Sequence, residues 1–259
     1  MNETTPNPSS VPPQIPTGTP PSGYPPRVPL GEIPEERQAI SGLAAAIESI
    51  LRQPRRVMFQ LRQPGGGKLI AAMLFIAVAC SLIYGVIVGS FSGGVQWWAA
   101  PVKISGGLLI SALICLPSLY IFACLSGSQA RLVEIFGMVA GLLMLMTILL
   151  IGFAPVAWLF SQSTESLAWM GFLHLLFGLI ATAFGVRFLS AAFAQSKARS
   201  SAGLGTWVII FVLVMLQMTT ALRPIVGTAD TLFPTEKKFF LSHWFDSMDK
   251  AAKKDRAND

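Results

Sequence analysis

A few polar residues interrupt the long apolar stretches of this sequence, and they are the first candidates for chemistry. His174, Gln217 and Thr220 lie inside apolar stretches, and Arg223 lies near the end of the last one, directly before Pro224. Polar side chains are costly inside a bilayer and often belong to a functional site. If the helices that carry them pack together, these four residues could form a polar cluster that binds a substrate.

The same residues also have a purely structural interpretation. The Arg223 side chain could extend from its helix end to the lipid headgroups. His174 and Gln217 could hydrogen-bond to neighbouring helices and help to hold them together. The sequence alone leaves both interpretations open.

No complete catalytic or cofactor motif is present in the sequence. H-E-x-x-H and G-x-S-x-G are both absent, and the two acids of the apolar region, Glu134 and Glu165, lie at opposite ends of one apolar stretch. Cys80, Cys115 and Cys124 have no metal-ligand spacing, so we expect buried thiols. We therefore predict a protein that is not an enzyme, with no catalytic residue, no cofactor and no metal.

The elements that carry the polar residues are apolar enough to cross a membrane. Residues 135–160 contain no charge and one clearly polar side chain, Thr147. About 18 apolar residues suffice to cross the hydrocarbon core as a helix. Apolar residues make up 53% of the chain and charged residues 12%, about half the charged share of an average soluble domain. These features predict an integral membrane protein.

Five apolar stretches predict an all-α, polytopic transmembrane helix bundle with about five spans, which together form a domain over residues 68–227. Repeated small residues in these stretches should allow the helices to approach closely. The spans are expected at about 69–91, 102–125, 132–160, 167–186 and 206–226. The small residues are Gly85, Gly89 and Gly93 in the first span, Gly137 and Gly141 in the third, and Ala181 and Gly185 in the fourth.

Basic residues predict the orientation of the spans, because cytoplasmic flanks are rich in Lys and Arg. With the N-terminus inside, nine cations flank the spans on the cytoplasmic side and two, Lys103 and Arg223, on the outer side. An odd number of spans then places the C-terminus outside and the candidate polar cluster in the outer half of the bundle. The formal net charge of +6 comes mostly from residues beside apolar stretches, which favours anionic headgroups over nucleic acid.

Three segments outside the spans have distinct compositions. Residues 1–33 belong to a proline-rich stretch that we expect to be disordered. Residues 34–67 form an amphipathic and basic segment, with a helix from Pro34 that ends before Pro54, and residues 228–259 predict a second interfacial amphipathic helix. The basic segment should bind anionic lipid at about 1 kcal/mol per cation. Its candidate lipid contacts are Arg52, Arg55, Arg56, Arg62 and Lys68.

The approach to the first span, from Ile50-Leu51-Arg52-Gln53-Pro54 to Phe59, resembles the Yip family of small membrane proteins. A comparable leucine, proline and phenylalanine approach precedes the first of five spans in bacterial members. The resemblance covers roughly residues 47–226 and implies no site residue. The acidic and tyrosine-containing signatures of eukaryotic relatives, which are linked to small GTPases and vesicle traffic, are absent here.

Together these features predict an integral membrane scaffold or interaction protein of Yip-like type. Its partners would be the lipid bilayer with its anionic headgroups, and another membrane protein or a second copy of the chain. The alternative is a small permease, or the membrane subunit of a transport complex, that uses His174, Gln217 and Arg223. A cation-coupled transporter usually needs an acid near the middle of the membrane, and this sequence has none there.

Overall fold

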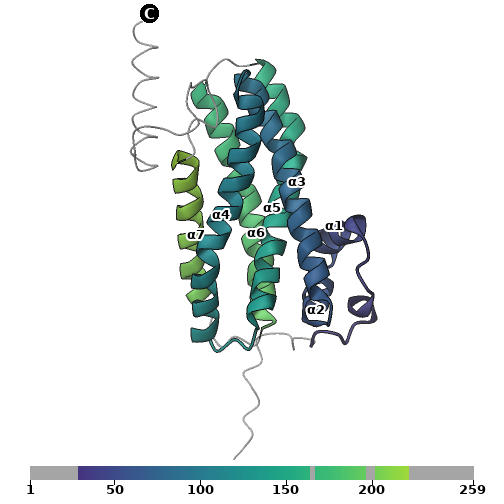
Figure 1. Ribbon diagram of the computed structural model, residues 1–259. Coiled ribbons are helices and arrows are strands. Elements are labelled where there is room, and N and C mark those ends of the chain that lie inside the picture. The colour runs from purple at the N-terminus through teal and green to yellow at the C-terminus, as the bar shows by residue number, and fades with distance from the viewer. Residues whose placement is uncertain (1–28, 164–166, 197–201, 222–259) are drawn as a thin grey trace, which may run out of the picture.

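The computed structural model describes residues 29–163, 167–196 and 202–221, and these are helical with no strand among them. Five long helices stand side by side, and short helices lie against one end of the bundle (Figure 1). We name this end, where the first long helix begins, the α2 end. The long helices are α3 (Gly66–Ser92), α4 (Gln96–Leu125), α5 (Leu132–Ser163), α6 (Leu167–Ala194) and α7 (Ala202–Ala221).

Four of the long helices, α3 to α6, are long and apolar enough to cross a membrane. The expected integral membrane protein with an all-helical bundle is therefore confirmed. The described apolar part of α7, Gly203–Thr219, is shorter than a full span, so a fifth span remains a prediction. The proline-rich residues 1–28 and the expected helix within 228–259 lie outside the described residues.

Contacts connect the long helices in the order α7, α4, α3, α5, α6, and α4 also touches α5. The central helix of the bundle is α5, which packs on α3 and α6. In its most apolar stretch, 72% of the residues are buried inside the protein. Its single polar side chain in the middle of the membrane, Thr147, donates hydrogen bonds to the carbonyl oxygens of Leu143 and Met144, both at 3.0 Å. The polar group of Thr147 is thus satisfied within α5 itself.

Glycines permit the close helix contacts, as the sequence predicted for Gly85 and Gly185; Gly93, predicted to be in the same set, instead ends α3 with a φ of +66° and meets nothing within 4 Å. A Cβ on Gly85 of α3 would overlap the backbone of Pro101 in α4, and one on Gly185 of α6 would lie 2.8 Å from Met146 Cγ in α5. Pro117 and Pro155, which we expected to kink or end their helices, lie inside α4 and α5 without ending either one.

The segment before the bundle is not the single helix predicted from Pro34 to Pro54. It contains a short 3-10 helix, η2 (Pro34–Arg37), and two separate helices, α1 (Leu43–Arg52) and α2 (Pro54–Arg62). Gly42 separates η2 from α1 with a φ of +89°, a conformation that glycine adopts without strain. Pro54 occupies the first position of α2, where its missing N–H costs no hydrogen bond.

Both short helices pack on the bundle. Leu61 of α2 fills the space above Gly137, and Ile50 of α1 lies next to Gly141, so both glycines are covered by the preceding segment. Val57 and Met58 are also buried there. The sequence left open whether this segment lies on the membrane surface or on the helix bundle. These contacts show that the buried faces of α1 and α2 pack on the bundle.

We predict that Gly85→Ala destabilises the bundle by about 1–3 kcal/mol, because the added methyl group must displace the backbone of α4 at Pro101. Gly178→Ala is the matched control, since a Cβ at Gly178 would meet nothing within 4 Å. Unfolding by denaturant in mild detergent measures the difference. Equal stability of the two variants would contradict the close α3–α4 contact.

Candidate functional site

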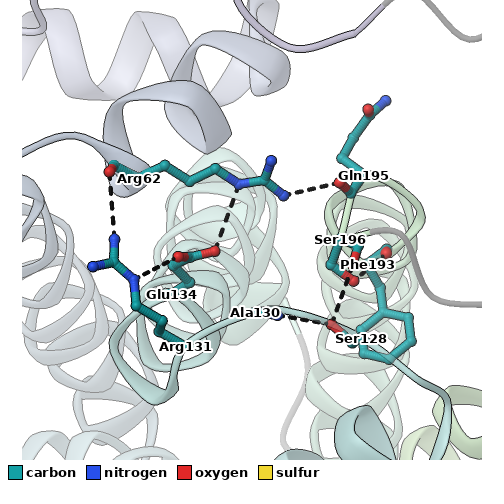
Figure 2. A network of polar contacts seen from close by, with 8 residues as sticks. All are labelled: Arg62, Ser128, Ala130, Arg131, Glu134, Phe193, Gln195 and Ser196. Carbon is teal, nitrogen blue, oxygen red and sulfur yellow. Dashed lines mark hydrogen bonds and ion pairs between the residues drawn. The ribbon is translucent and has the colours of Figure 1, made fainter.

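A buried carboxylate at the α2 end joins three parts of the chain. Glu134, in the first turn of α5, is 7% exposed. Its Oε1 accepts a hydrogen bond from Arg131 Nε at 3.0 Å, and its Oε2 lies 3.5 Å from Arg62 Nε at the end of α2. Figure 2 shows the two guanidinium groups on opposite sides of this carboxylate. The ion pairs therefore fix the end of α2 to the start of α5.

The same cluster extends to the end of α6. Arg62 donates a hydrogen bond to the carbonyl oxygen of Gln195 at 2.8 Å. The backbone N–H of Gln129 donates to the carbonyl oxygen of Ser196 at 3.3 Å. The Ser128 hydroxyl lies 3.4 Å from the same oxygen (Figure 2). Gln195 and Ser196 form the turn directly after α6, so the α4–α5 loop and Arg62 bind the carbonyl groups of this turn. We call the cluster of Arg62, Arg131 and Glu134, together with Ser128, Gln195 and Ser196, the clasp (Figure 2).

A second ion pair holds the segment before α1 on α2. Glu36 of η2 is 3% exposed, and its Oε1 accepts a hydrogen bond from Arg55 Nε at 2.5 Å. Its Oε2 accepts one from the backbone N–H of Gly31 at 2.5 Å. Gly31 itself has a φ of +91° and lies against the ring of Phe59, so no larger side chain fits there.

These contacts change the interpretation of the predicted lipid-binding cations. Arg55 and Arg62 form ion pairs inside the protein, and Arg56 donates to the carbonyl oxygens of Gln38 and Ala39. The exposed cations of the five are Arg52, which pairs with Glu48 at 3.4 Å, and Lys68 in the first turn of α3. Contact with anionic headgroups remains a prediction for all five residues.

Glu134→Gln should destabilise the protein by about 1–3 kcal/mol, because two guanidinium groups lose a largely buried charged partner. Glu48→Gln is the matched control at an exposed pair, whose loss should cost less than about 0.5 kcal/mol. Denaturant unfolding and proteolysis between α2 and α3 report the change. If both variants unfold alike, the clasp does not contribute to stability.

In the other half of the bundle, His174 of α6 contacts α3. Its Nδ1 lies 2.8 Å from the hydroxyl of Tyr84, and the two rings meet edge to face with centroids 5.7 Å apart. Tyr84 is 4% exposed. The other ring nitrogen, Nε2, is buried and has no hydrogen-bond partner among the described residues. The sequence selected His174 but not Tyr84, since a tyrosine in an apolar stretch is not distinctive without its partner.

The other members of the predicted polar cluster are less completely described. Gln217 lies on α7, which packs along α4 and touches α6 only briefly. The side chain of Thr220 and all of Arg223 lie outside the described residues. The observed partner of His174 is therefore Tyr84, and convergence of the four predicted residues stays untested.

Lys103 is a polar residue whose burial the sequence analysis did not predict. It was counted among the outer flanking cations, but α4 begins at Gln96, so Lys103 lies seven residues further along the helix and is 6% exposed. That distance corresponds to about 10 Å of helix. The sequence predicted a span from about residue 102, whereas α4 begins at Gln96 and accommodates Pro101 inside the helix.

The cavity identified in the bundle is apolar. It is a groove of about 210 Å³ between α3, α4 and α5, and it is open on one side. Its walls are aliphatic side chains together with Phe136. Within the described residues, no group of three or more His, Cys, Asp or Glu could hold a metal ion. The Tyr84–His174 pair and the clasp are thus two polar constellations in the described part of the bundle.

No protein-family model, curated protein or solved structure matches this chain. The resemblance to the Yip family therefore remains a hypothesis from the sequence.

If His174 holds helices together, removing it should act through Tyr84. Tyr84→Phe and His174→Leu should each cost about 0.6–2 kcal/mol of bundle stability, and the double variant should cost less than the sum. Denaturant unfolding of the two single variants and the double variant measures the coupling. Strictly additive losses would mean that the hydrogen bond contributes nothing.

Proposed function

We propose that this chain is a non-enzymatic membrane scaffold or interaction protein of Yip-like type. The observation that supports this function best is the combination of an apolar, closed bundle centre with a rigidly attached platform at one end. The buried helix α5 contains no polar side chain in the middle of the membrane besides Thr147, which hydrogen-bonds within its own helix. Such a centre provides no polar path for a solute along α5.

The platform consists of η2, α1 and α2. Two buried carboxylates, Glu36 and Glu134, are bound by arginines that hold η2 to α2 and α2 to the bundle. A fixed surface loses less entropy on binding than a mobile one. The platform is therefore suited to present one shape to a partner protein, either another membrane protein or a second copy of the chain.

The alternative is a small permease or the membrane subunit of a transport complex. It is favoured by the buried Nε2 of His174, which has no hydrogen-bond partner among the described residues. A buried polar atom of this kind is costly unless it has a function or a bound molecule. Lys103 is a second buried polar residue in the same half of the bundle. In this case the site would take a polar solute from the end of the bundle opposite α2.

Affinity purification of the full chain in mild detergent distinguishes the two functions. For a scaffold, we expect a stoichiometric membrane-protein partner, or a second copy, that elutes with the wild type and with Glu48→Gln but is at least about ten-fold depleted with Glu134→Gln. This ratio corresponds to about 1.4 kcal/mol of binding energy.

The second arm uses proteoliposomes of the purified chain. Uptake of a polar solute that His174→Leu abolishes while the protein stays folded would overturn the scaffold function and establish the permease. A partner that carries an ATPase would instead identify a subunit of a transport complex.

We also propose that the α2 end faces the cytoplasm. Arg52, Arg55, Arg56, Arg62 and Lys68 lie at this end, whereas Lys103 is buried within α4. At the opposite end, Trp97, Trp98, Trp158 and Trp169 are each at least half exposed, as expected for an interfacial aromatic belt.

In a variant without native cysteines, Gln129→Cys should react with an impermeant thiol reagent only after the membrane is opened. Gln162→Cys, at the other end of α5, is the control and should react in intact cells. The reverse pattern would invert the orientation.

A further inference from the structure

Helix α1 has three faces, and the other residues that the structure describes cover only one of them. Ala46, Ser49 and Ile50 are buried against the bundle. Leu43 and Leu51 are 45% and 48% exposed although they are strongly apolar. An exposed apolar surface outside the membrane spans requires an explanation, because it would otherwise contact water.

The residues outside the bundle contact separate into an apolar face and a charged face. At 3.6 residues per turn, Leu43, Ile47 and Leu51 fall within about 80° of one another around the helix. Leu43 and Leu51 are exposed, whereas Ile47 is half-buried and packs in part against the core. The next sector carries Glu48 and Arg52, whose side chains are 66% and 77% exposed and pair at 3.4 Å. The helix therefore presents a bundle face, an apolar face and a charged face in succession.

Contacts of Ile50 fix the depth of α1 along the bundle. The Ile50 Cδ1 atom lies 3.3 Å from the position of a Cβ on Gly141, and the ring of Phe188 lies 2.6 Å from the same position. Ile50 of α1, Gly141 of α5 and Phe188 of α6 are therefore at one level. Two long helices thus provide independent measures of this depth.

Both helices place that level just inside the hydrocarbon core. The 32 residues of α5 span about 48 Å, so about 9 Å extends beyond each face of a centred core about 30 Å thick. Gly141 lies nine residues, or about 14 Å, from the start of α5, which is about 5 Å inside the core. The 28 residues of α6 give about 3 Å for Phe188 by the same reasoning.

We propose that α1 lies at the boundary of one leaflet, with Leu43, Ile47 and Leu51 among the acyl chains and Glu48 and Arg52 among the headgroups. The occupant of the apolar face is therefore lipid rather than protein. Apolar insertion, more than charge, would hold this face in the leaflet, because Arg55 and Arg56 already bind carbonyl or carboxylate oxygens of the chain. In Figure 1 α1 lies against the flank of the long helices, clear of their tips.

Site-directed spin labelling of the full chain tests this placement. Single cysteines replace Leu43, Ile47, Leu51, Glu48, Arg52 or Ala46 in a background without Cys80, Cys115 and Cys124. Each labelled protein is reconstituted into phosphatidylcholine nanodiscs. Oxygen concentrates among acyl chains, while a water-soluble nickel chelate stays outside, so the ratio of their collision rates reports depth.

The oxygen-to-nickel ratio should be at least about three-fold higher at positions 43, 47 and 51 than at 48 and 52, because a polar chelate is excluded from hydrocarbon. A label at position 46, which is buried, should collide with neither reagent. The apolar face and the charged face each have at least two positions, so loss of one variant to misfolding leaves its sector measurable.

Equally low ratios at positions 43 and 48 would overturn the proposal, since α1 would then lie in water, and equally high ratios would overturn the placement of Glu48 among the headgroups. Protection of 43, 47 and 51 from both reagents would also overturn it, and would show that protein covers the apolar face. Dilution of labelled chains with unlabelled ones would then identify a second copy through loss of spin–spin coupling. Neither result depends on a scaffold partner, so the test is separate from that of the proposed function.

Discussion

Close contact between helices is the constraint on which the structure depends. Inside a bilayer, burial from water cannot favour helix–helix contacts over helix–lipid contacts, so association requires surfaces that fit closely. The central helix α5 meets this requirement at two glycines. Leu61 and Ile50 of the short helices pack at Gly137 and Gly141, and Phe188 of α6 also packs at Gly141. The same helix therefore organises both the membrane bundle and the platform at its end.

Polar interactions act mainly at the α2 end of this packed frame. Glu134 forms ion pairs with Arg62 and Arg131, and Glu36 forms one with Arg55. Burying a carboxylate is costly unless it is paired, and here each buried acid is paired with a cation from another element or from the adjoining loop. Such pairs specify which elements meet more than they add to overall stability.

This arrangement bears on function through the surfaces and polar groups that it leaves available for a partner or a solute. Most of the basic residues of the segment before α3 bind the protein itself, so the platform combines fixed internal charges with an exposed apolar face on α1. The polar groups of the opposite half, His174 with Tyr84 and the buried Lys103, are separate from this platform. A scaffold would use the first region, and a permease would use the second.

The sequence by itself determined that the helices need a lipid environment, that the fold is an all-helical bundle, and that glycines allow close helix packing. These properties depend on local composition, since about 18 consecutive apolar residues require a lipid environment and small residues permit close approach wherever they occur. Four long apolar helices and the contacts of Gly85 and Gly185 confirm this. Element boundaries were predicted less well, because Pro101 and Pro117 are tolerated within a helix that neighbouring helices support.

Only the tertiary structure decided which polar groups meet. The sequence could not pair Arg62 with Glu134, 72 positions apart, or Tyr84 with His174, because such contacts depend on how whole helices are placed. It therefore assigned Arg55, Arg56 and Arg62 to lipid, although their nearest partners are carboxylates and carbonyl oxygens of the chain. The exposed face of α1 likewise became recognisable only once its other face was seen packed against α5.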